Sequence, residues 1–71
     1  MADPVSWLMI EPGWRVVTAD GAELGLVDSV RGDTSADIFD GLDVRAGGRE
    51  TTRYVPAESV GSIFPGEIHL T

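Results

Sequence analysis

The chain has 71 residues, no cysteine, and twelve acidic against five basic residues, giving a formal charge of −7. A domain of this size buries only about 60% of the surface that its unfolded chain exposes, so we expect one domain of modest stability. The missing cysteines exclude disulfides and thiolate metal sites, and the negative charge disfavours nucleic acid and anionic membranes as partners. With no basic signal-peptide start and no long apolar run, we expect a soluble cytoplasmic protein.

Residues 1–4 are polar and are expected to fray; an apolar segment, residues 5–10 (VSWLMI), follows. Such a run is typical of a strand covered on both faces or of a segment that packs on something else. We therefore interpret residues 5–12 as an N-terminal extension or an extra strand. Ordinary core packing explains the run as well as an interface does, but tryptophan is common at interface hot spots. The interface candidates are Val5, Trp7, Leu8, Met9 and Ile10.

The next stretch, residues 14–31, predicts two β-strands joined by a tight turn, because Asp20 and Gly21 tolerate positive φ. The second strand carries an apolar set spaced three residues apart: Leu24, Val27 and Val30. This spacing does not match the period of two in a strand and needs an extra residue. We expect Gly25 to supply it as a β-bulge or a bend.

A polar loop at residues 32–37 leads to a strand at residues 38–46, in which apolar and charged side chains alternate. A turn at Gly47-Gly48 follows, and Pro56 starts one helical or 3-10 turn at residues 56–59. Three more strands are expected, at residues 52–55, 60–64 and 68–70. Short strands separated by turns indicate an all-β fold, a small barrel or a sandwich, in a single domain of residues 1–71.

The groups capable of chemistry form no catalytic set. His69 is the only histidine and alternates with apolar neighbours, so we expect it to point outward without triad or zinc-site partners. Four aspartates fall close together without the EF-hand spacing: Asp33, Asp37, Asp40 and Asp43. A solvated acidic loop is expected there, and a weak divalent-ion contact at Asp33 and Asp37 is the alternative. We predict no catalytic residue, no cofactor and no metal site.

Three stretches together resemble the PRC-barrel family: residues 14–27 (WRVVTADGAELGLV), 54–60 (YVPAESV) and 66–70 (GEIHL). The resemblance covers residues 13–70. It implies a small, strongly bent antiparallel β-barrel of about five or six short strands that serves as a docking surface for other macromolecules. It implies no catalytic residues. The matching positions that shape the barrel are Gly21, Leu24, Gly25, Val27 and Pro56.

We therefore expect a non-enzymatic protein-interaction module, homodimeric through residues 5–10, whose other partner is unidentified. The acidity favours a basic protein, although it also fits simple solubility, and the all-arginine basic set fits either a GC-rich genome or salt adaptation. One alternative is a small ligand- or ion-binding barrel or an enzyme, which a deep polar pocket would favour. The other, by analogy with a ribosome-maturation protein of the family, is a ribosome-associated factor docking on a basic ribosomal protein.

Overall fold

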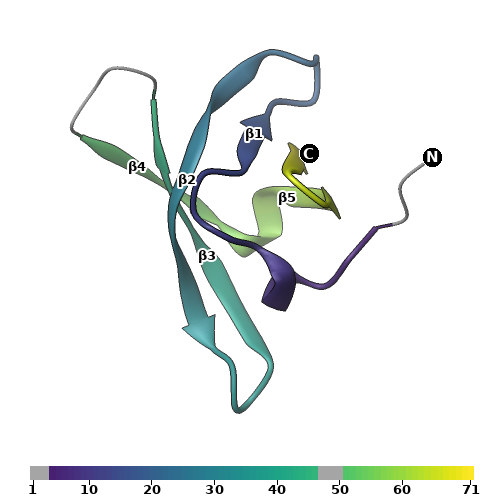
Figure 1. The fold of residues 1–71 in the computed structure, drawn as a ribbon, viewed down its shortest axis with the longest axis vertical. Helices are drawn as coiled ribbons and strands as arrows, with labels where there is room; N and C mark the ends of the chain where they lie inside the picture. The colour runs from purple at the N-terminus through teal and green to yellow at the C-terminus, as the bar shows by residue number, and fades with distance from the viewer. Residues whose placement is uncertain (1–3, 47–50) are drawn as a thin grey trace.

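The computed structural model describes residues 4–46 and 51–71 and contains six strands and two 3-10 turns (Figure 1). In chain order these are η1 Trp7–Met9, β1 Arg15–Val17, β2 Glu23–Asp33, β3 Ile38–Arg45, β4 Thr52–Pro56, η2 Ala57–Ser59, β5 Val60–Phe64 and β6 Glu67–Leu70. The all-β prediction is confirmed, and every strand expected after Pro12 is present. The turn predicted near Pro56 is η2, for which Pro56 is the N-cap residue. Residues 1–3 and the Gly47-Gly48 turn lie outside the described residues.

The strands form one sheet in the order β4-β3-β2-β1-β6-β5. Its ladders are antiparallel except the one between β1 and β6, which is parallel and pairs Arg15 with Glu67 and Val17 with His69. Parallel neighbours need a long connection, and here it consists of everything from β2 to β5. The wholly antiparallel pairing implied by the resemblance therefore holds for every ladder but this one.

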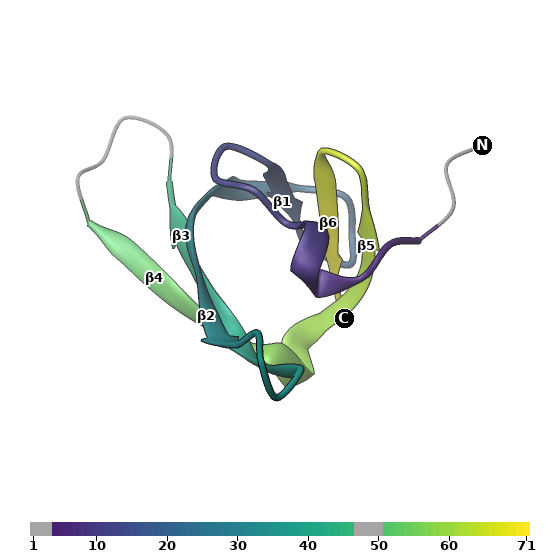
Figure 2. The same cartoon turned by 60° about the horizontal axis from the view of Figure 1, so that its bottom comes forward.

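The sheet is strongly curved. Figure 2 shows β3 and β4 on one side of the molecule and β1, β6 and β5 on the other, with the long β2 running between them. The two ends of the strand order, β4 and β5, are joined along the chain by η2, and no ladder links them in the described residues. Within residues 4–46 and 51–71, hydrogen bonds between edge strands thus do not close a barrel.

Two one-residue insertions bend β2. Leu24 is the extra residue opposite β1, beside Gly25, and Asp28 is the extra residue opposite β3. Together they turn the predicted apolar set of β2 toward the core. The expected bulge is therefore present, with Leu24 rather than Gly25 as the extra residue, and the bulge at Asp28 is a second one that was not expected. Gly25 has a further reason to be glycine, because a Cβ there would collide with the backbone carbonyl oxygen of Arg45 on β3.

The turn between β1 and β2 differs in detail from the two-residue turn expected. Gly21 alone is left-handed, with a φ of 90°, and Asp20 has an ordinary backbone conformation. The Thr18 amide donates a hydrogen bond to the Ala22 carbonyl at 2.8 Å, which closes a three-residue connection. The Thr18 hydroxyl also donates to the Asp20 carboxylate and lowers its pKa.

The core lies between the two halves of the curved sheet. Strand alternation supplies it, since Leu42 and Val44 of β3 point inward while Asp43 and Arg45 take the other face. The buried apolar cluster consists of Ile10, Val16, Val27, Leu42, Val44, Val55 and Ile68. Of these, only Ile10 comes from outside the strands and tight turns of the sheet. The N-terminal segment is therefore part of the folded domain.

Residues 5–10 do not form a strand, so the extra-strand alternative is wrong, and the segment is an extension folded back on the sheet. The Ser6 hydroxyl accepts a hydrogen bond from the Leu8 amide at 3.2 Å and caps η1. The Trp7 carbonyl accepts from the Ile10 amide at 3.1 Å, so the backbone closes on itself locally. One backbone bond joins the segment to β5, from the Val5 amide to the Ile63 carbonyl at 2.7 Å.

Candidate interaction surface

Trp7 anchors the N-terminal segment to the tip of the β2–β3 hairpin. Its indole stacks on Phe39 with 5.2 Å between ring centroids and 15° between ring planes. Its Nε1 donates a hydrogen bond to Oδ1 of Asp37 at 3.0 Å. Within the chain, the apolar ring of the indole thus has a stacking partner and its polar N–H has a hydrogen-bond acceptor.

The hairpin is shaped to receive this ring. A Cβ on Gly32 would collide with the backbone carbonyl oxygen of Ile38 on β3 and would lie 3.0 Å from Cη2 and 3.1 Å from Cζ3 of Trp7. The absent side chain therefore serves both the close approach of β2 to β3 and the seating of the indole. Asp37 holds its carboxylate in place from a left-handed backbone position, with a φ of 53°. We call Gly32, Asp37 and Phe39 the indole notch. Sequence reasoning did not find it, because no periodicity connects position 7 with positions 32–39.

Docking of Trp7 leaves the other side of η1 facing solvent. Leu8 is 50% exposed and Met9 is 58% exposed, and we call these two side chains the η1 surface. Of the other interface candidates, Ile10 is buried in the core, and Val5 and Trp7 are half-buried. The five residues that the sequence grouped together are therefore divided by the fold between an inner and an outer side.

Other exposed large side chains lie on the sheet. Leu26 pairs in register with Arg15 on one side and Arg45 on the other, and Ile38 follows Asp37 at the hairpin tip. Tyr54 of β4 covers Gly41, where a Cβ would lie 2.8 Å from its ring. An aromatic residue diagonal to a glycine on the next strand is a sequence signal that could have indicated this contact.

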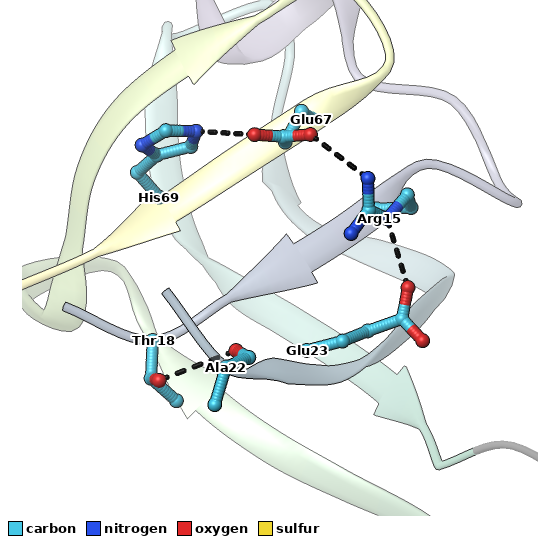
Figure 3. A network of polar contacts seen from close by, with 6 residues as sticks. All are labelled: Arg15, Thr18, Ala22, Glu23, Glu67 and His69. Carbon is cyan, nitrogen blue, oxygen red and sulfur yellow. Dashed lines mark hydrogen bonds and ion pairs between the residues drawn. The ribbon is translucent and has the colours of Figure 1, made fainter. Parts of the chain in front are cut away.

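A chain of polar contacts crosses β2, β1 and β6 on the outer face of the sheet (Figure 3). Nε of Arg15 lies 2.8 Å from Glu23 and its Nη1 lies 3.2 Å from Glu67, contacts that raise the pKa of Arg15, the hydrogen bond to Glu23 most. Nε2 of His69 lies 2.6 Å from the other oxygen of Glu67. His69 thus points outward, as predicted, and its imidazole is paired with a surface carboxylate.

Asp43 forms a second polar group on this face. Its Oδ2 accepts hydrogen bonds from Nε of Arg31 and from Oγ of Ser29, each at 2.8 Å. The bond from Arg31, followed by that from Ser29, holds the pKa of this buried carboxyl below its usual value. Arg31 also lies 5.8 Å from the ring centroid of Tyr54, whose pKa burial raises. Arginine and carboxylate neutralise each other here.

The carboxylates of the acidic loop are engaged in hydrogen bonds within the chain. Oδ1 of Asp33 accepts hydrogen bonds from the Ser35 amide at 3.0 Å, the Ser35 hydroxyl at 2.7 Å and the Ala36 amide at 3.3 Å. These bonds lower the pKa of Asp33, the Ser35 hydroxyl most, while Asp37 accepts from Trp7 and Asp43 pairs with Arg31. Among the described residues, no group of three potential ligands could hold a metal ion.

An open cavity of about 320 Å³ lies beside the end of β3 and the start of β4. None of its described lining residues is an acid, a histidine or a cysteine. The lining residues are Leu24, Val44, Ala46, Thr51, Thr52 and Arg53. The described part of the lining thus contributes Arg53 as its one ionisable side chain.

No model of a known protein family matches the chain. No curated protein matches it either. In the described residues no helix has both the length and the apolar character needed to cross a membrane.

Proposed function

We propose that the chain is a non-enzymatic protein-interaction module, similar to a PRC-barrel domain, that forms a homodimer through the η1 surface. The six-stranded sheet has the strand number and the strong bend that the PRC-barrel resemblance implies, but one of its ladders is parallel and none closes a barrel among the described residues. A domain this small gains stability when it buries further apolar surface against a second copy.

The observation that carries this proposal is the exposure of Leu8 and Met9 within a stretch without charge. Residues 4–10 contain no ionisable side chain, in a chain whose formal charge is −7. Two copies with this charge repel each other, so they are most easily brought together where carboxylates are absent. Burial of large apolar side chains supplies the attraction, in the twofold arrangement that is commonest among homo-oligomers.

The outer face of the sheet is less suited to self-association. Leu26, although 42% exposed, lies between Arg15 and Arg45, each paired with carboxylates. Covering this leucine would remove those ion pairs from water, which costs desolvation free energy. The charged surface that a dimer leaves exposed favours a basic protein as a further partner. We place the module in the cytoplasm, since secreted domains of this size commonly need disulfides.

Light scattering at micromolar concentration tests the proposal on three chains. We expect the wild type to be a dimer and the Leu8→Ser/Met9→Ser double variant to be a monomer. Leu26→Ser, which removes a similarly exposed leucine from the outer face, should remain a dimer. A monomeric wild type would refute self-association, and dissociation by Leu26→Ser instead would move the interface to the outer face.

A further inference from the structure

The indole notch binds one side chain, Trp7, from a segment of the same chain that is also held by the buried Ile10 and by the bond from the Val5 amide to the Ile63 carbonyl. Trp7 is held by ring stacking on Phe39, by the hydrogen bond to Asp37 and by the bare backbone at Gly32. Each of these contacts is local to the hairpin tip. None of them depends on how the segment is connected to the rest of the chain.

The connection itself is short and exposed. Residues 11–13, Glu-Pro-Gly, are all exposed, and the turn they make is closed by a long bond of 3.3 Å from the Trp14 amide to the Glu11 carbonyl. Gly13 already belongs to the sheet side, because its amide donates to the Val27 carbonyl at 2.8 Å. The link between segment and sheet therefore consists of Glu11 and Pro12, which few contacts hold in place.

Docking within one chain leaves Leu8 and Met9 in water, as described above. If the link opens, the segment of one copy can enter the notch of another while the second copy reciprocates. Two segments that cross in this way run close to each other near the twofold axis, where their exposed apolar side chains can be buried. The notch of its own chain is present at a high effective concentration near the segment, which favours docking within the chain. Exchange between copies therefore requires the additional burial of Leu8 and Met9.

We propose that the homodimer is domain-swapped, with residues 4–10 of each copy placing Trp7 in the indole notch of the other copy. This inference rests on the proposed homodimer and specifies which residues each copy supplies to the other. Exchange of an identical element is a low-cost route to dimers, because the contacts made between copies are those already made within one.

Mixing two complementary variants tests the exchange. Trp7→Ser has a notch but no anchor. Gly32→Val has an anchor but a blocked notch, and because its valine also collides with the Ile38 carbonyl oxygen, each result is required from a second blocking chain as well. Each variant alone should be monomeric by native mass spectrometry. Their equimolar mixture should contain a heterodimer, in which Trp7 of the Gly32→Val chain enters the notch of the Trp7→Ser chain, with a blue shift of tryptophan emission.

The control replaces the Gly32→Val chain by the Trp7→Ser/Gly32→Val double variant, which has no anchor to donate, and no heterodimer should form. Phe39→Ser is used in parallel as a second notch-blocking chain, in case the valine disrupts the hairpin. A mixture that behaves as the sum of its monomers with both blocking chains overturns the exchange. If the wild type is still a dimer that Leu8→Ser/Met9→Ser dissociates, the proposed function stands without the exchange.

Discussion

The β2–β3 hairpin and the N-terminal segment contact each other, but they are held in place in different ways. The hairpin is a long antiparallel ladder in which backbone meets backbone so closely that Gly25 admits no side chain. The segment makes no ladder at all and depends on one indole, one backbone bond to β5 and the buried Ile10.

Because of this difference, we expect the hairpin and the segment to be destabilised by different kinds of substitution. A continuous ladder distributes its stabilisation over many hydrogen bonds, so the hairpin should tolerate the loss of a surface side chain. It should be destabilised when a Cβ is added where the backbones of two strands are in contact. A segment held by a single large ring should show the reverse, because loss of that ring removes most of what orders it. Local openings of low free energy are expected for such a segment.

The largest effect is expected from Gly25→Val, which forces a branched side chain against the carbonyl of Arg45. Overpacking of this kind costs about 1–3 kcal/mol, and we expect the upper part of that range. The urea midpoint measures it. Gly61→Ala is the control, because the nearest atom to its Cβ is 3.2 Å away, and it should cost less. An unchanged midpoint for Gly25→Val would remove close backbone approach as the reason for this glycine.

Trp7→Ala should come next, at about 2 kcal/mol, below the 3–5 kcal/mol typical of fully buried tryptophan because the ring is half-buried. Hydrogen exchange should show faster exchange of the Val5 and Ile10 amides and little change in β3. Leu8→Ala, measured on monomeric protein at low concentration, should leave both stability and exchange near wild type. Equal acceleration throughout the sheet would mean that the segment and the hairpin unfold as one unit.

Asp43, on the outer face of the hairpin, should make the stability of the protein depend on pH. The folded pKa of Asp43 lies below its ordinary value of 3.8, so the stabilisation from its bonds to Arg31 and Ser29 is complete above that value. It is lost as the pH falls through the lower, folded pKa. Asp43→Asn should therefore lose less stability than wild type between neutral pH and about pH 2, as measured by urea midpoints. Identical acid losses in the two proteins would contradict the assignment to Asp43.

The smallest effect, none, is expected from calcium. Since Oδ1 of Asp33 already accepts hydrogen bonds from Ser35 and Ala36, we expect neither EDTA nor added calcium to move the melting temperature. A rise of several degrees with calcium would show selective binding to the folded state and a site at the hairpin tip.

The positions of the strands can be predicted from the amino-acid sequence, because the patterns that define a strand are local. Alternation at residues 38–46 placed Leu42 and Val44 on one face of the strand and Asp43 on the other. The spacing of three in β2 required an extra residue, and the ladders contain two. Glycine and proline marked the turns for the same reason, since their backbone preferences do not depend on distant contacts.

The conformation of residues 5–10, in contrast, depends on contacts with distant parts of the chain. Their apolar run fits a strand, a core element and an interface equally. The choice among them depended on Gly32, Asp37 and Phe39, which lie 25 or more positions from Trp7 along the chain. The parallel pairing of β1 with β6 is of the same kind, since it joins the two ends of the domain. Contacts between residues so far apart leave no periodic trace in a single sequence, so the division of the segment into buried Ile10, docked Trp7 and exposed Leu8 and Met9 could only come from the fold.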